Sequence, residues 1–308
     1  MADALASGAS VRKDVGVQVP PRPQLMLVRF SPVVQQLSQL RRSQNLLWNL
    51  TLRELRSKSR RSFLGWAWSM LNPLSNMVIY WFVFGVVFGA TAPIGDPSGI
   101  EIYALYLLSG ILPWGFFALV TNLGLGSLLG NSGLVKKVYF AWETLVFAQV
   151  IFSFVQFCIE MSLLCVALLI VGSPIAPWLP FAFLLMLLLA VYAAGFALAL
   201  STLAVYFRDL RYLWTIIIQV MFFATPIIYT PDKIEGKVPQ VLEFILHWNP
   251  MAVFVQAFRD LLYSGKAPHW GHIGYLLVAS VAVFVLGWTI FVKQSRRLAE
   301  ELLSLIHI

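Results

Sequence analysis

Hydrophobic positions run through most of this chain in long tracts that contain no Asp, Glu, Lys or Arg. These tracts lie between Arg61 and Asp96, Glu101 and Lys136, Glu160 and Arg208, and Lys266 and Lys293. A run of roughly 20 apolar residues crosses the hydrocarbon core of a bilayer, and a soluble fold has no reason to exclude charge for so long. The pattern therefore predicts an all-α integral membrane protein.

The polar breaks between the apolar tracts predict how many helices cross the membrane. Clusters of Gly, Pro and Asp at 93–99, of Gly, Ser and Pro at 172–180, and a tight turn at 207–211 separate the hydrophobic runs. We expect six transmembrane helices, at about 66–89, 103–126, 143–171, 180–206, 212–229 and 271–292. Composition agrees, because 59% of the residues are hydrophobic and only 12% are charged.

The net charge of +8 could suggest nucleic-acid binding, but its distribution points to a membrane topology instead. Most Lys and Arg lie before the first span, at 136–137, at 208–211 and at 293–297, whereas the others are Lys233, Lys237, Arg259 and Lys266. With six spans these two groups fall on opposite sides of the bilayer, as the positive-inside rule requires. We therefore expect a multi-pass protein of the plasma membrane with both termini cytoplasmic and no nucleic-acid partner.

The segment before the first span divides into a tail and a helix. Residues 1–43 contain Pro, Gly, Ser and scattered charges, which is typical of a flexible cytoplasmic tail. Residues 45–63 predict an amphipathic helix in the inner headgroup layer, with one apolar face formed by Trp48, Leu52, Leu55 and Phe63. The alternative is a solvated basic linker that only enforces topology. Residues 298–308 are expected to form a cytoplasmic C-terminus.

The region 230–270, which we call the external gate region, is too long for a simple turn and is still rich in apolar residues. Prolines at 231, 239, 250 and 268 divide it into short pieces such as 241–248 and 251–263. Short re-entrant amphipathic helices in the outer leaflet would explain both the apolar content and the breaks. A folded external cap is the alternative.

Few residues suggest chemistry of their own. Cys158 and Cys165 share one helical face in an apolar segment and are interpreted as core residues, so no metal site is expected there. Glu160 is the acid placed well inside a predicted span, where Gln149 and Gln156 could form a polar strip with it. Its role is either in the transport path or in a structural hydrogen bond.

Four stretches resemble a known family. They are YLLSGILPWGFF at 106–117, VYFRDLR at 205–211, TPIIY at 225–229 and WNPM at 248–251. Together with LGWAWSMLNP at 64–73, they resemble the permease subunits of type-2 ABC exporters for polysaccharides, a group that handles O-antigen, teichoic acid, capsule and mycobacterial galactan. The resemblance covers about 48–297, so 44–297 is expected to form one permease domain.

The resemblance implies a transport subunit and not an enzyme. It implies a homodimer docked on two copies of a cytoplasmic ATPase, moving a lipid-linked polysaccharide, held by polyprenyl diphosphate, to the outer leaflet. Neither Gly236-Lys237 nor Gly265-Lys266 is followed by the Ser or Thr of a phosphate-binding loop, so ATP and Mg²⁺ are expected in the partner. The basic tail and the Ala-, Leu- and Val-rich spans favour galactan as the glycan.

Three sets of site residues follow. The resemblance places the coupling segment to the ATPase at 131–142, with Lys136, Lys137, Tyr139 and Phe140 as its contacts. Aromatic rings can stack on sugars, so the substrate path is expected along Tyr80, Trp81, Phe222, Phe223 and Tyr229, together with Glu160. Guanidinium and ammonium groups in the headgroup layer could bind the diphosphate, which assigns headgroup binding to Arg53, Arg56, Lys58, Arg60 and Arg61.

Two other functions remain open. A type-2 ABC permease for small lipids or drugs would share the same architecture. A membrane transferase acting on polyprenyl-linked sugars would need clustered acids or metal ligands, whereas Asp232, Glu235 and Asp260 are dispersed and His247, His269 and His272 form no complete set. Co-purification with an ATPase would separate the transferase from the transporters.

Overall fold

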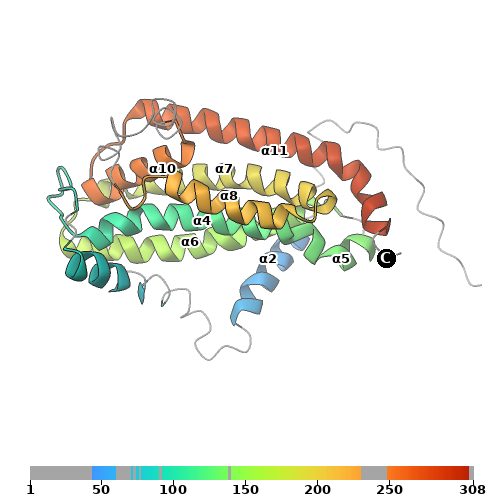
Figure 1. The fold of residues 1–308 in the computed structure, drawn as a ribbon, viewed down its shortest axis with the longest axis horizontal. Coiled ribbons are helices and arrows are strands. Elements are labelled where there is room, and N and C mark those ends of the chain that lie inside the picture. Colours follow the sequence, from blue (N-terminus) through green and yellow to red (C-terminus); the bar gives the residue numbers. More distant parts are fainter. Residues whose placement is uncertain are drawn as a thin grey trace, which may run out of the picture.

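The computed structural model describes residues 44–59, 71, 74–75, 78–89, 92–137, 140–229 and 248–304. Within these ranges the chain is helical and contains no strand, so the predicted all-α class is confirmed for this part. The longer helices lie side by side along the long axis of the molecule (Figure 1). The expected tail at 1–43 lies outside the described residues.

In the described part, four helices are long and apolar enough to cross a membrane. They are α4 (Tyr103–Gly130), α6 (Glu143–Val171), α7 (Leu179–Tyr206) and α11 (Trp270–Ser304), whose apolar part ends at Ser295. The 3₁₀ turn η2 (Ala176–Trp178) leads into α7. Helices α6 and α7 lie where the charge-free tracts predicted them. Helix α11 continues well beyond the expected 292.

Two further apolar helices are shorter. Residues Val78–Val87, which include the π-helix η1 (Trp81–Val87), belong to the predicted first span, and α8 (Leu210–Ala224) belongs to the predicted fifth. Helix α8 ends before the predicted 229 because Thr225 precedes Pro226 and adopts an extended conformation. The count of six complete spans therefore stays a prediction.

Glycines allow the long helices to approach closely. A Cβ on Gly195 of α7 would lie 2.6 Å from the backbone oxygen of Val283 on α11, and a Cβ on Gly287 would meet the Gly195 carbonyl. Similarly, a Cβ on Gly124 of α4 would lie 2.5 Å from the Cβ of Ala197. Small residues are typical of helix contacts in membranes, where close backbone approach replaces the hydrophobic effect as the source of association.

The external gate region contains a buried helix. Residues 230–247 lie outside the described part, but α10 (Pro250–Phe258) continues directly into the π-helix η4 (Arg259–Ser264). The predicted piece at 251–263 is thus helical, and its re-entrant position in the outer leaflet stays a prediction. Residues on all of its sides are buried, because it packs against α4, α7 and α11 instead of lying on the surface.

The N-terminal helix α2 (Gln44–Ser59) packs against α6 with a different face from the predicted one. Leu50 and Thr51 are buried and Leu47 packs against the core, whereas Trp48 is 60% exposed. The helix therefore has two apolar stripes, one against the protein and one, with Trp48, on the outside. The sequence predicted the outer stripe with Trp48 but not the stripe that packs against the protein.

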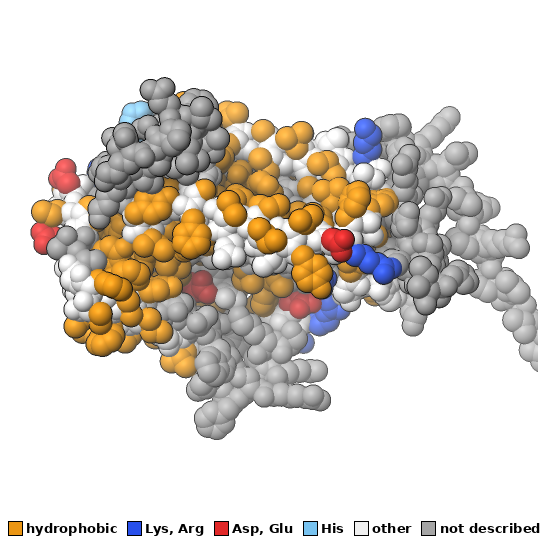
Figure 2. All heavy atoms as spheres, viewed as in Figure 1, with side chains coloured by type: hydrophobic (Ala, Val, Ile, Leu, Met, Phe, Trp, Pro, Cys, Tyr) orange, Lys and Arg blue, Asp and Glu red, His pale blue; other side chains and the backbone are white. Residues whose placement is uncertain are grey.

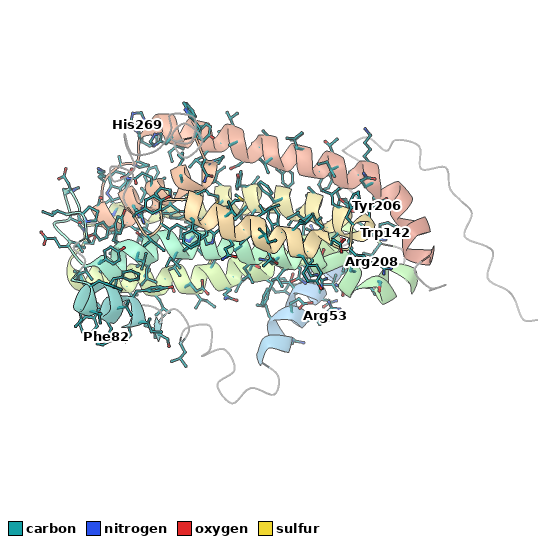
Figure 3. All side chains as sticks on the ribbon, viewed as in Figure 1. Arg53, Phe82, Trp142, Tyr206, Arg208 and His269 are labelled. Atoms are coloured by element: carbon teal, nitrogen blue, oxygen red, sulfur yellow. The ribbon has the colours of Figure 1, made fainter. Side chains whose placement is uncertain are left out.

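The two ends of the bundle separate the loops that the charge pattern assigned to opposite sides. Arg53, Trp142, Tyr206 and Arg208 lie at one end, and Phe82 and His269 lie at the other (Figure 3). Figure 2 shows hydrophobic side chains covering much of the face over α8 and its neighbours. This arrangement fits a molecule that crosses a bilayer along its long axis. We refer to these ends as the α5 end and the α10 end.

Candidate functional site

Three of the four signature stretches converge at the α10 end of the bundle, whereas the stretch 205–211, which contains Tyr206 and Arg208, lies at the α5 end (Figure 3). Tyr106 comes from the first turn of α4, residues 225–229 follow α8, and Asn249 precedes α10. Asn249 caps α10 by accepting a hydrogen bond from the Met251 backbone nitrogen at 3.0 Å. Its amide also donates to the Thr225 hydroxyl at 3.2 Å. One side chain therefore joins two of the stretches.

Arg259 forms the centre of this cluster. Its side chain is 2% exposed, and it donates hydrogen bonds to the carbonyl oxygens of Pro226 at 2.7 Å and Ile227 at 2.6 Å. The guanidinium carbon lies 3.8 Å from the centre of the Tyr106 ring, a cation–π arrangement. Among the described residues no carboxylate forms an ion pair with it. Its charge is therefore balanced by carbonyl dipoles and ring faces.

Tyrosines extend the cluster. The hydroxyl of Tyr103 donates to the Ile228 carbonyl at 2.6 Å, and the hydroxyl of Tyr263 lies 2.6 Å from the Ile100 carbonyl. The Tyr106 and Tyr263 rings meet edge to face with centroids 5.4 Å apart. The bend after α8, the 93–100 loop and η4 are thereby joined through side-chain to backbone contacts.

Asp260 lies next to Arg259 in sequence but belongs to a different set of contacts. It accepts a hydrogen bond from Gln256 at 3.1 Å and lies 3.9 Å from the Lys266 ammonium. Burial raises the pKa of Asp260, and the Lys266 charge partly opposes this shift. His269 and His272 have ring centroids 5.1 Å apart, and the described residues contain no group of three or more potential metal ligands.

Most of the predicted substrate-path residues lie on or near two segments, η1 and the bend after α8. Glu160 lies apart from both. Tyr80 packs on Phe84, whose ring lies 5.3 Å from that of Tyr103, and Tyr103 in turn binds the bend after α8. Trp81 is exposed. Close to the same bend, Phe222 packs against Trp114, Phe223 is 61% exposed, and the Tyr229 hydroxyl donates to the Phe223 carbonyl at 2.7 Å.

Glu160 does not join these groups. It lies on α6 and accepts a hydrogen bond from Gln156 at 2.8 Å, whereas α8 packs against α4 and α7. The predicted partnership with Gln156 is therefore present. The cysteines of the same helix, Cys158 and Cys165, are free thiols that pack against the core.

The predicted headgroup cations are described only in part. Arg53 donates hydrogen bonds from one nitrogen to Glu54 at 2.8 Å and to Asn131 at 2.9 Å, and Arg56 is exposed. Lys58 belongs to α2, but its side chain is not described, and Arg60 and Arg61 lie outside the described residues. Arg53 therefore connects α2 to the end of α4, a contact that its spacing did not suggest.

The coupling segment contains the short helix α5 (Ser132–Lys137). Lys136 and Lys137 end this helix, but their side chains are not described, and Tyr139 lies outside the described residues. Phe140 packs against the hydrophobic core instead of projecting away from it. Figure 1 shows α5 at the end of the bundle opposite α10.

By sequence Arg259 was only one of the charges of the 230–270 region, and its buried position was not predicted. A signal was present, because the run 250–264 is largely apolar and helical in pattern apart from Gln256, Arg259 and Asp260. A cation within such a run must find buried acceptors.

The fold and the convergence of these stretches define a polytopic helical membrane subunit, and comparison with known proteins identifies its class. The model of the ABC-2 type transporter family matches residues 45–263, so the chain belongs to this family. Members are the membrane subunits of ABC transporters; the chain is a transport subunit and its ATPase is a separate partner.

Relatives of known assignment are similar over most of their length. The chain is 29% identical to an O-antigen export system permease protein of Klebsiella pneumoniae over 84% of this chain and 95% of the relative. It is 27% identical to an O-antigen export system permease protein of Myxococcus xanthus over 88% and 99%. A polysialic acid transport protein of Escherichia coli is 22% identical over 79% and 90%.

Proposed function

We propose that this permease exports a polysaccharide across the bacterial plasma membrane. The observation that carries the proposal is the similarity, over most of their length, to permeases named for O-antigen export and to a protein named for polysialic acid transport. The chain contributes helices and no nucleotide-binding motif, so the work is supplied by its ATPase partner with ATP and Mg²⁺. Both termini face the cytoplasm, where that partner docks.

The substrate in this proposal is a glycan held by a lipid, of the polyprenyl diphosphate type, that moves from the inner to the outer leaflet. Galactan is the glycan that we favour. Depleting the permease in its host and identifying the lipid-linked polymer that accumulates on the inner leaflet tests this directly. Accumulation of a galactan supports the full proposal, another polymer corrects only the glycan, and no polymer contradicts polysaccharide export.

A second copy of the chain completes the transporter in this proposal. Helix α8 buries only Trp214, and several large apolar side chains along it are exposed, among them Leu213, Ile216 and Val220. One set of spans offers no second wall for a polymer path, so a two-fold pair with two ATPase copies is the simplest closed assembly. Cysteine cross-linking from Ile216→Cys, with Val278→Cys on α11 as control, tests whether α8 faces the second copy.

The aromatic residues near the bend after α8 are proposed to contact sugar. Phe223 is the accessible member, because it is 61% exposed, whereas Tyr229 is partly buried and Tyr80 and Phe222 are packed against other rings. Phe223→Leu keeps the residue hydrophobic but removes the ring face, and export should fall. Phe183→Leu, at an exposed ring on α7, is the matched control. Equal export by both variants would make Phe223 a lipid-facing residue.

A permease for small lipids or drugs is the second candidate, because the family as a whole does not fix the cargo. Substrate-stimulated ATP hydrolysis separates the two. Stimulation by the isolated lipid-linked polymer, and none by short-chain lipids or amphiphilic drugs, supports polysaccharide export. A sugar transferase is disfavoured by membership in a transporter family.

A further inference from the structure

Helix α8 is too short to cross a bilayer from where it begins. Exposed Arg208 and Asp209 precede it, which places its start near the membrane boundary at the α5 end. Its 15 residues rise about 22 Å, whereas the hydrocarbon core is roughly 30 Å thick. The bend 225–229 therefore lies at membrane depth, where irregular backbone needs protein donors because water is absent.

Side chains from three elements supply these donors. Arg259 of η4 binds the carbonyls of Pro226 and Ile227, and Tyr103 of α4 binds that of Ile228. The amide of Asn249 lies 3.5 Å from the Ala224 carbonyl and 3.2 Å from the Thr225 hydroxyl. Arg259 lies just beyond the C-terminal end of α8, and the negative end of the helix dipole favours a cation at this place.

Arg259 is held so tightly that it defines the position of the bend. Its guanidinium lies on the Tyr106 ring, and a Cβ on Gly110 of α4 would lie only 3.1 Å from one of its terminal nitrogens. The two terminal nitrogens of Arg259 donate to two different carbonyls, and the planar shape of the guanidinium makes this possible. A lysine ammonium would keep the charge but would lose the fork and its stacking surface.

The rest of α8 packs less completely, since Ile218, Met221 and Phe222 are only partly buried against the core. Trp214, near the α5 end, is its one buried residue and packs with Leu125, Leu200 and Ala204. Helix α8 is therefore anchored at one end by an indole and at the other by the contacts of the bend. Loss of the contacts of the bend would leave the α10 end of α8 held only by the partly buried Met221 and Phe222, while the Trp214 contacts stay in place.

We infer that Arg259 is a positioning residue for transport, which fastens the α10 end of α8 to α4 and η4 and thereby keeps the bend 225–229 closed between transport steps. The inference rests on the transport role of the family and not on the identity of the glycan. Opening of this end requires both hydrogen bonds of Arg259 to break together, because they converge on one guanidinium. The ATPase cycle must therefore supply the free energy for this release.

Thiol accessibility of the bend tests the inference. The permease–ATPase complex, carrying Cys158→Ala, Cys165→Ala and Ile228→Cys, is placed in nanodiscs and labelled with a membrane-impermeant maleimide without nucleotide. Both Arg259→Gln and Arg259→Lys should raise the labelling rate at least about tenfold, the shift expected when a charge-assisted hydrogen bond holding a two-state element is lost. Lys266→Gln, at the exposed cation nearby, should leave the rate unchanged.

A second readout separates positioning from simple loss of folding. The Arg259 variants should still assemble with the ATPase and hydrolyse ATP. Export per ATP hydrolysed should fall, because opening of the bend would no longer depend on the ATPase cycle. If Arg259→Gln does not assemble, Gly110→Ala displaces the guanidinium without removing it and should increase labelling in the same direction. Wild-type labelling and wild-type export in any assembled variant would overturn the inference, whatever glycan is transported.

Discussion

Arg53 shows how one side chain can connect two elements at the α5 end. It lies on α2, and its guanidinium binds the Asn131 side chain at the C-terminal end of α4. The Asn131 amide in turn donates to the Ser127 carbonyl in the last turn of α4. Helix α5 begins at the next residue, Ser132. The Arg53–Asn131 contact therefore links α2 to the residue that directly precedes α5.

Arg53 and Asn131 should act as a pair. We expect Arg53→Gln and Asn131→Ala each to lower coupling between ATP hydrolysis and export, and the double variant to be no worse than either. The coupling energy should be below about 1 kcal/mol, because the Arg53 side chain is half exposed. Arg56→Gln on the same helix is the control. If the losses of coupling in the two single variants add up in the double variant, and Arg53→Gln also weakens binding of the lipid-linked substrate, Arg53 acts in headgroup binding instead.

Asp260 should make stability depend on pH. Its folded-state pKa is raised by burial, so the folded protein holds its proton over a range in which the unfolded chain, with an ordinary value of 3.8, has lost it. Stability should therefore fall as pH rises from about that value through the raised pKa, and Asp260→Asn should flatten this dependence. Thermal inactivation of the detergent-solubilised complex measures it.

Lys266 gives the control for the Asp260 prediction. Its charge opposes the effect of burial, so Lys266→Gln should raise the Asp260 pKa further and extend the fall to higher pH. Identical pH profiles for wild type, Asp260→Asn and Lys266→Gln would show that this carboxyl is not desolvated.

At the scale of elements, the closest contact between helices is that of α7 with α11. Gly195 and Gly287 face each other so closely that neither has room for a side chain. Apolar periodicity does not specify such a contact, because both helices are apolar on several sides. The two glycines fix where the helices cross, and the crossing determines where α10 can be enclosed between them.

Gly287→Ala should destabilise the protein, by about 1 to 3 kcal/mol, because its methyl group would overlap the Gly195 carbonyl. Gly274→Ala on the same helix is the matched control, since a Cβ there meets nothing within 4 Å. It should be neutral or mildly stabilising, as Ala is a better helix former than Gly. Measured thermal midpoints of both variants decide the point, and equal midpoints would contradict the close crossing.

At the scale of the whole molecule, the two ends of the bundle carry different elements. The α5 end carries α2 and the predicted coupling segment with α5, whereas α10 lies at the other end (Figure 1) and continues into η4 with the buried Arg259. Long, closely packed helices join the two ends. Movement at α5 can therefore reach the bend after α8 only by displacing whole helices, which is typical of a transporter that is driven by its partner.

Reversing the charges of Lys136 and Lys137 to Glu should uncouple the permease from its ATPase. The two lysines end α5, and opposite charge at a docking surface is expected to weaken and misdirect the contact. Export and ATPase retention on purification are the measurements. Arg208→Glu, an exposed cation at the same end, is the control. Phe140→Ala is a poorer test, because Phe140 packs against the core and its loss would also lower stability.

The sequence by itself determined where the long helices lie. Helix α6 occupies Glu143–Val171 and α7 occupies Leu179–Tyr206, close to the predicted 143–171 and 180–206. Exclusion of charge from the hydrocarbon core is a local requirement, so it is written in each segment separately. The early end of α8 was also readable, because Pro226 disfavours a helix at the residue before it, but the prediction extended the helix past this signal.

Only the tertiary structure decided which faces meet and where the charges lie. The spacing of Trp48 and Leu52 predicted one apolar face of α2. The stripe with Leu47 and Leu50, which packs on the protein, was not recognised from the sequence. Arg259 could be a surface cation by sequence, and its burial depends on carbonyls more than 30 residues away in a bend that forms after α8 ends. Such contacts depend on how helices cross, and helices that are apolar on several sides do not specify their crossings through periodicity.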